Sequence, residues 1–296
     1  MPKEFLFKVG KFKMYLDPLK RGISGQLFGQ GYREPCFMWI IKREAKGNLG
    51  LDIGANLGYV TLHLAQNMKK VIAIEPDKRP LKLLKKNIKI NNFSNKVEIM
   101  NCTLSDKGGK EIIYLSKKRP NLNTFCDSGF LKKSKDFKEK KNISVMTLDD
   151  MNLSPNFIKM DIEGYEVNVI EGGINTLKKQ KECKLLIEVH PQYYNGERDF
   201  SKILEKLYSI GFTSKYVVSA GGECPDLFKK RGYSPIKTFV DGEHKRGIFC
   251  NISKKDVIDF CAYPNVQEYE YTDSDSGKTI KKVSKKIARS LLMVKQ

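Results

Sequence analysis

Acidic side chains and a histidine directly follow two apolar segments of this 296-residue chain. Asp161 and Glu163 come after the first segment, which reads FIKM, and Glu188 and His190 close the second, which begins KLLI. A carboxylate or an imidazole can take a proton from a weak nucleophile such as a hydroxyl, and general-base catalysis contributes ~10²–10⁴-fold to a rate. The two segment ends are therefore candidates for proton transfer.

These residues also have structural interpretations. Acids at a helix start are stabilised by about 0.3–1 kcal/mol through the helix dipole, and we expect a helix to begin near Tyr165. A lone histidine is more often structural than functional. Asp161, Glu163 and His190 could together bind Mg²⁺ or Mn²⁺, which carboxylates and imidazole suit. No spacing in the sequence requires an ion, and we expect no metal.

A second pattern, LDIGANLGYVTLHL at 51–64, is typical of a strand that turns sharply into a helix. Gly54 and Gly58 lack a Cβ, so the backbone N–H groups of the turn can approach a ligand. The next apolar segment, VIAIEP, ends in Glu75, where an acid can accept hydrogen bonds from both ribose hydroxyls. The turn is shorter than that of dinucleotide binders, which favours S-adenosylmethionine over NAD. The alternative is a strand–helix–strand unit in which the glycines only permit the helix to pack closely on the strand.

Strands and helices that alternate along the chain must position these residues. Apolar periodicity predicts helices at 33–45, 58–68, 76–92, from about 165, and at 200–210. Strands are expected at 49–53, 71–75, 97–101, 111–115, 143–148, 157–160, 184–189, 214–219 and 246–251, after two short ones within 4–16. This order predicts an α/β fold with a mainly parallel sheet and right-handed crossovers.

The chain divides into three predicted parts. Residues 1–45 form an N-terminal extension, 46–256 the main domain with a loop-rich insertion at 117–142, and 257–296 a tail. In the tail, 268–277 are acidic and polar, which is typical of a linker. Residues 278–296 carry seven Lys or Arg, no acid, and apolar residues at intervals of three and four. We expect a basic amphipathic helix that either meets an anionic membrane or packs on its own domain.

The composition is strongly basic, with 54 Lys and Arg against 34 Asp and Glu, a net charge of +20. Such a charge suits a polyanionic partner, although lysines spread over most predicted helices favour solvated faces. Seven cysteines without a C-x-x-C spacing argue against disulfides or zinc and for a reducing compartment. The N-terminus does not resemble a signal peptide, and no run of about 18 apolar residues could span a membrane. We expect a cytoplasmic location, peripheral to a membrane if the tail helix binds one.

Several motifs together resemble the FkbM family of S-adenosylmethionine-dependent methyltransferases. They are ISGQLFGQGYREP at 23–35, LDIGANLGYVTLHLA at 51–65, AIEPDKRPLKLLKKNIKINN at 73–92, TLDDM at 147–151, KMDIEGYEVNVIEGG at 159–173 and LIEVHP at 186–191. The resemblance implies the Rossmann-like class I methyltransferase fold, with seven strands, helices on both faces and one late antiparallel strand. It also implies O-methylation, usually of a sugar hydroxyl in a glycan, glycolipid or natural product.

The resemblance also suggests roles for single residues. Gly54, Asn56 and Gly58 would line the methionine end of the cofactor. Asp52 would brace the turn through backbone N–H groups or a water, and Glu75 would bind the ribose. Asn101 and Cys102, at the end of the third core strand, would flank the adenine. Asp161 would lie beside the cofactor's sulfonium methyl, and His190 or Glu163 would take the proton of the acceptor hydroxyl.

Two other functions compete with this interpretation. A nucleic-acid (RNA) methyltransferase would suit the net charge, but the segment after the strand at 157–160 reads DIEGYE and not the NPPY-like motif of base N-methylating enzymes. C5-methylating enzymes need a Cys in a Pro-Cys context, and Pro35-Cys36 is in the wrong place. A cofactor-binding module without catalysis is disfavoured by intact Gly54, Gly58, Glu75 and Asp161.

Overall fold

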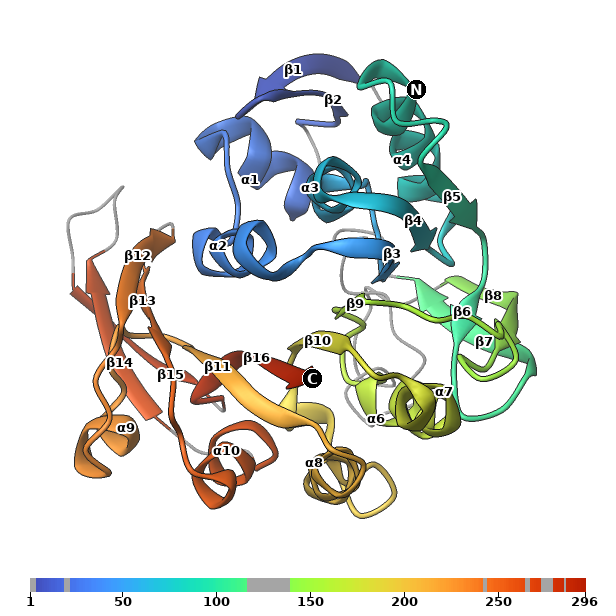
Figure 1. Cartoon of the computed structure of the whole chain (residues 1–296). Helices are drawn as coiled ribbons and strands as arrows, with labels where there is room; N and C mark the ends of the chain where they lie inside the picture. The colour runs from blue at the N-terminus through green and yellow to red at the C-terminus, as the bar shows by residue number, and fades with distance from the viewer. Residues whose placement is uncertain are drawn as a thin grey trace.

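A computed structural model of the chain describes residues 4–18, 22–115, 139–241, 244–263, 267–272, 279–284 and 286–296. The predicted insertion at 117–142 lies almost wholly outside these residues; only its last four belong to the described strand β8 (Glu139–Met146). Within the described ranges, Figure 1 shows one large twisted sheet with helices on both sides. The predicted α/β class is confirmed.

The large sheet has nine strands in the order β12-β13-β11-β16-β10-β9-β3-β4-β5. The strands are β3 (Gly47–Ile53), β4 (Met68–Ile74), β5 (Val97–Met100), β9 (Phe157–Met160), β10 (Cys183–Glu188), β11 (Thr213–Ser219), β12 (Lys237–Asp241), β13 (His244–Phe249) and β16 (Ala288–Lys295). The pairs β5-β4, β4-β3, β3-β9 and β9-β10 are parallel. β16 is antiparallel to both of its neighbours. The carboxyl ends of the parallel strands therefore meet at one edge, where ligands of such sheets bind.

Helices cover both faces because the central strands are apolar on both sides. α2 (Pro35–Glu44), α3 (Tyr59–Asn67) and α4 (Lys78–Ile90) share one apolar cluster with the sheet. The opposite cluster holds α6 (Glu166–Glu171), α7 (Ile174–Lys179), α8 (Phe200–Ser209), α9 (Asp226–Lys230) and α10 (Lys254–Cys261). Apart from α7, α9 and α10, these helices lie where the periodicity predicts them.

The first residues form a small unit beside the sheet. The hairpin of β1 (Phe5–Val9) and β2 (Phe12–Leu16) and the helix α1 (Ile23–Gln30) pack with α3 and α4 in a third apolar cluster. Two further small sheets pair β6 (Thr103–Leu104) and β7 (Gly109–Leu115) with β8, and β14 (Gln267–Thr272) with β15 (Thr279–Ser284). In Figure 1, α1 lies between the hairpin and α3, so the N-terminal extension packs on the helices that cover the sheet.

The predicted tail helix is wrong. Residues 279–284 and 288–295 are strands, and β16 lies inside the large sheet between β10 and β11. Its side chains alternate between the two faces: Leu291 and Met293 join one apolar cluster, and Leu292 and Val294 the other. The tail therefore supplies a core strand and not a membrane-binding helix. Part of the predicted linker at 268–277 is likewise strand β14, and its remainder lies outside the described residues.

The predicted count of seven strands is also corrected. Besides the seven predicted strands, of which β13 corresponds to 246–251, the sheet contains β12 at its edge and β16 between β10 and β11. β13 is antiparallel to β11, and β16 is antiparallel to β10 and β11. A strand there suits the sequence LLMV, because helices cover both faces of the sheet and the strand must bury both of its own.

No helix among the described residues is long and apolar enough to cross a membrane. The six cysteines in these ranges are free thiols. The cytoplasmic location stays a prediction.

Candidate active site

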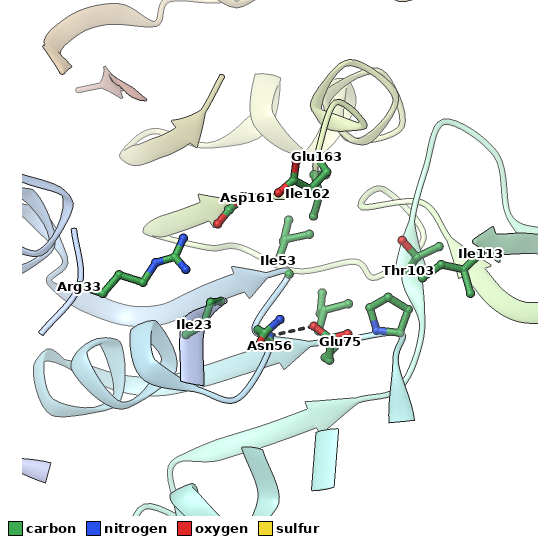
Figure 2. Close-up of a pocket in the computed structure, with 13 residues that line it drawn as sticks. Ile23, Arg33, Ile53, Asn56, Glu75, Thr103, Ile113, Asp161, Ile162 and Glu163 are labelled. Carbon is green, nitrogen blue, oxygen red and sulfur yellow. Dashed lines mark hydrogen bonds between the residues drawn. The ribbon is translucent and has the colours of Figure 1, made fainter. Parts of the chain in front are cut away.

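A pocket opens at the carboxyl edge of the parallel strands, where the loops after β3, β4 and β9 meet (Figure 2). The loops after β3, β4 and β9 each contribute residues that the sequence singles out. Side chains from the N-terminal segment and the small sheet complete the wall. The lining residues are Ile23, Arg33, Ile53, Gly54, Asn56, Ile74, Glu75, Pro76, Thr103, Ile113, Asp161, Ile162 and Glu163.

The turn after β3 packs directly on the turn after β9. Gly54 has a φ of 79°, and a Cβ built on it would lie 2.2 Å from the carbonyl oxygen of Asp161. No side chain fits there, so the glycine lets the two loops meet. Asn56 follows with a φ of 49°, a conformation that Asn tolerates better than most residues. Gly54 and Asn56 thus line the pocket as predicted.

Glu75 ties the turn after β3 to the turn after β4. One carboxylate oxygen accepts the Asn56 N–H at 2.8 Å, and the other accepts the Asp77 N–H at 2.8 Å. Burial raises the pKa of Glu75 to about 7, although both backbone donors oppose the rise. A carboxylate has about four acceptor sites, so each oxygen can still accept a ribose hydroxyl.

Asp52 braces the glycine turn by a route that differs from the prediction. Its carboxylate is fully buried, pairs with Lys159 Nζ at 2.9 Å and accepts the Thr61 hydroxyl at 2.6 Å. Lys159 in turn donates to the Gly54 carbonyl at 2.8 Å. Asp52 and Lys159 are register partners on the adjacent strands β3 and β9. Asp52 therefore acts on the turn through a lysine and its carbonyl bond, not through backbone N–H groups or a water.

Three predicted cofactor contacts do not line the pocket. Gly58 precedes α3, and a Cβ there would lie 2.6 Å from Leu84 Cδ1, so its role is packing. The Asn101 amide donates to the carbonyl oxygens of Glu75 and Pro76 and supports that loop from behind. Cys102 is buried in the core. Thr103, the next residue, reaches the pocket instead.

Asp161 and Glu163 face the pocket from the turn after β9. Glu163 has a φ of 53°, which is rare for a side chain of this type. Burial raises the pKa of Glu163 to about 7, and burial together with repulsion from Glu188 raises that of Asp161 to about 6. Within the described ranges, neither carboxylate accepts a hydrogen bond from the protein. Glu163 can therefore exchange a proton near neutral pH.

His190 lies behind these carboxylates and does not line the pocket. Its Nδ1 is 2.9 Å from Glu166 Oε1, and its Nε2 lies 3.7 Å from Glu163 Oε2 and 3.6 Å from Glu188 Oε1. Burial alone would lower its pKa, but Glu166 and Glu163 raise it to about 9. An imidazolium cannot accept a proton, so this geometry disfavours His190 as the base and leaves Glu163 in that role.

A buried ionic network beside the pocket joins Glu188 to Arg33, Glu34 and Arg289, which the sequence does not single out. Arg33 contacts Glu34 Oε1 through Nε at 3.0 Å and Nη2 at 2.5 Å. Arg289 of β16 contacts the same oxygen at 2.5 Å and Glu188 Oε1 at 3.2 Å. Burial by itself would raise the pKa of Glu34 and Glu188, but the guanidinium groups lower the pKa of Glu34 and hold that of Glu188 well below its usual range. The sequence offers one signal for this network, an Arg-Glu pair at 33–34 within a segment of the family motif.

Asp161, Glu163 and His190 also form a set of potential metal ligands, with one atom of each within 4.8 Å of the others. His190 presents Nε2 toward the acids while Nδ1 is held by Glu166, an arrangement found behind metal-bound imidazoles. The expectation that the enzyme needs no metal stays a prediction.

The pocket residues fit S-adenosylmethionine. Glu75 matches the ribose hydroxyls, the cradle at Gly54 would be filled by any Cβ, and Asp161 with Glu163 matches the positive sulfonium and ammonium groups. The wall of Pro76, Thr103 and Ile113 is uncharged, which suits an adenine ring.

Comparisons with known proteins identify the family of the chain. The Methyltransferase FkbM domain matches residues 52–214. An uncharacterized protein of Methanocaldococcus jannaschii is 29% identical over 129 residues, which are 40% of this chain and 49% of that protein, so the match spans about half of the curated relative.

Two solved structures are similar in fold. The methyltransferase FkbM of Methylobacillus flagellatus KT is 16% identical, with a TM-score of 0.38 over 84% of this chain and 44% of that one. The M. jannaschii TYW2 in complex with AdoMet is 15% identical, with a TM-score of 0.39 over 85% of this chain and 88% of that one. Neither likeness bears on the acceptor. The FkbM domain covers more than half of the sequence, and the chain therefore belongs to the Methyltransferase FkbM family.

Proposed function

We propose that this methyltransferase methylates a hydroxyl group of a sugar, in a glycan, a glycolipid or a natural product. The observation that carries the proposal is the Glu163 carboxylate, which lines the cofactor pocket next to Asp161 and whose pKa burial raises to about 7. A hydroxyl is a poor nucleophile while it keeps its proton, and Glu163 is poised to take that proton at neutral pH.

The methyl donor is S-adenosylmethionine, which supplies a methyl group already activated on a sulfonium. The residues of the chain then have three tasks. Glu75 fixes the ribose, Asp161 offers a negative charge to the cationic part of the donor, and Glu163 accepts the hydroxyl proton as the acceptor oxygen bonds to the methyl carbon. Alignment of the two reactants contributes much of the rate in such a displacement.

The acid-rich end of the pocket supports a polyhydroxyl acceptor. Asp161 and Glu163 line the wall, and no hydrogen-bond donor of the described residues occupies their oxygens. Carboxylates accept hydrogen bonds from neighbouring sugar hydroxyls, whereas they repel the phosphates of a nucleic acid. The sugar acceptor is thus preferred on electrostatic grounds.

A second candidate is an RNA methyltransferase. The net charge of +20 favours it, because a basic surface gains affinity from phosphate neutralisation. The two functions differ in the class of molecule that becomes labelled.

The test uses S-adenosylmethionine with a radioactive methyl group and an extract of the source organism, separated into glycans, lipids, RNA and protein. We expect label in a saccharide or glycolipid fraction with the wild type, and none with Glu75→Ala or Glu163→Gln. Glu98→Gln is the matched control, since this exposed acid pairs with Lys70 on the sheet edge, away from the pocket. Label in RNA would overturn the sugar proposal and favour the second candidate.

A further inference from the structure

We propose that the Arg33 guanidinium binds the α-carboxylate of S-adenosylmethionine, and that Arg289 of the C-terminal strand holds Arg33 in position through Glu34. The proposal rests on S-adenosylmethionine being the methyl donor and is independent of the acceptor.

Arg33 has an open edge toward the pocket. Its Nε and Nη2 both donate to one oxygen of Glu34, at 3.0 and 2.5 Å. In the part of the chain that the structure describes, Nη1 has no hydrogen-bond partner, and Arg33 lines the pocket. Because a guanidinium is a planar fork, the Nη1–Nη2 edge can still bind a carboxylate with two parallel bonds.

The position of Glu75 sets the direction of the cofactor. Figure 2 shows Glu75 between two unlike walls, with Arg33 and Asp161 on one side and Thr103 and Ile113 on the other. The ribose joins adenine to the charged amino-acid moiety, so the two ends must point to opposite walls. The Thr103–Ile113 wall offers no charge. The carboxylate and the ammonium group therefore point toward Arg33 and Asp161.

Among the lining residues of the described chain, Arg33 alone is cationic. The Lys159 ammonium group is already paired with Asp52 and donates hydrogen bonds to the carbonyls of the turn. A carboxylate at this end of the pocket thus has one cationic side-chain partner, while Asp161 suits the ammonium group.

Glu34 and Arg289 fix the guanidinium. Glu34 is buried and has a φ of 49°, so its carboxylate turns back onto its neighbour Arg33. Arg289 Nη2 contacts the same Glu34 oxygen at 2.5 Å, and Nη1 contacts Glu188 at 3.2 Å. Arg289 acts through Glu34 and is therefore a positioning residue. This links the C-terminal strand to the cofactor site.

The test is titration calorimetry of the full-length protein with S-adenosylmethionine and with its decarboxylated analogue, which lacks only the α-carboxylate. We expect the wild type to bind the first about 10- to 100-fold more tightly, the usual range for a hydrogen-bonded charge pair. Arg33→Gln should bind both ligands alike, with the affinity for S-adenosylmethionine reduced by that factor. Arg33→Lys should show a preference for S-adenosylmethionine between those of the wild type and Arg33→Gln. Arg289→Gln should reduce this preference several-fold.

The controls separate this proposal from its premises. Arg231→Gln, which removes an arginine that pairs with Asp259 of α10 and does not line the pocket, should leave both affinities unchanged. Glu75→Gln should weaken both ligands equally. An Arg33→Gln protein with a native melting curve and an unchanged preference would overturn the proposal, as would an effect confined to the KM of the acceptor. A wild type that binds neither ligand would overturn the cofactor assignment itself.

Discussion

Two glutamates of the site have a backbone conformation that their side chain disfavours. Glu34 and Glu163 have φ values of 49° and 53°, whereas the other non-glycine residues in this region of the described chain are all asparagines. The left-handed conformation costs about 1–2 kcal/mol for an ordinary residue. Such strain persists where the surroundings over-determine it, and it concentrates at functional sites. Here it aims one carboxylate at Arg33 and the other into the pocket.

For Glu163 we predict a specific pH dependence. Its pKa is raised to about 7, and only the deprotonated carboxylate can accept a proton. kcat/KM, which reports the groups of the free enzyme, should therefore rise with pH, with a midpoint near 7, and Glu163→Gln should lower it about 10²–10⁴-fold. Rates of both proteins between pH 5.5 and 8.5 measure this.

The same profile tests His190 as the alternative base. His190→Gln should retain the midpoint near 7 or shift it upward, since a cation that faces Glu163 is lost. A profile that keeps its midpoint in Glu163→Gln, and loses it only in His190→Gln, would assign the proton transfer to the histidine.

At the scale of elements, the sequence predicts what local patterns determine. The strands β3, β4, β9 and β10 are short apolar runs, and α4 and α8 repeat apolar residues at helical spacing. The prediction is wrong for β16, because Ile287, Leu291 and Val294 also recur at the interval of a helix. The deciding fact, that LLMV is buried on both faces between β10 and β11, depends on distant partners.

The site likewise contains residues that local patterns predict and residues that only long-range contacts bring together. Gly54, Asn56 and Glu75 follow strands that are easy to predict, so their pocket positions could be inferred from the sequence. Arg33 and Arg289 lie more than 250 residues apart and meet at Glu34 only in the folded chain. No local pattern reports such a contact.

The central position of β16 gives a prediction on stability. Leu292 is fully buried in the apolar cluster that α2, α3 and α4 share with the sheet, so Leu292→Ala should lower the free energy of unfolding by about 2–5 kcal/mol. Val240 on the edge strand β12 is 60% exposed, and Val240→Ala should change the free energy of unfolding by less than about 0.5 kcal/mol. Urea unfolding of both variants measures the difference. Equal, small effects would mean that residues 288–295 are not a core strand.

At the scale of the whole molecule, several buried groups make stability depend on pH in one direction. The pKa is raised to about 6 for Asp161, about 7 for Glu75 and Glu163, and about 9 for His190. A group with a raised folded-state pKa contributes stability that is complete below its unfolded pKa and is lost as pH rises through the folded value. The folded state should therefore be most stable in mild acid.

We predict that the free energy of unfolding of the cofactor-free protein falls between pH 5 and 9. Above pH 7.5 the remaining loss belongs mainly to His190, whose full contribution is up to about 3 kcal/mol between its unfolded and folded pKa. His190→Gln should flatten the curve in this upper range. Denaturant unfolding at half-unit pH steps measures it. A stability that rises from pH 6.5 to 9 would contradict the charge states assigned to the site.

The net charge of +20 sets a final prediction, which separates the two candidate functions without knowledge of the acceptor's structure. Binding of a polyanion releases counterions, and a protein with six to ten phosphate contacts loses ~10³–10⁵-fold in affinity between about 50 and 200 mM salt. A sugar acceptor without phosphates releases none. We expect kcat/KM for the labelled acceptor fraction to change less than about threefold over this range, because the Asp161–Glu163 wall binds hydroxyls through short-range hydrogen bonds. A steep fall, with a log–log slope of several units, would mean that the lysines on the helices contact a phosphate backbone and that the acceptor is RNA.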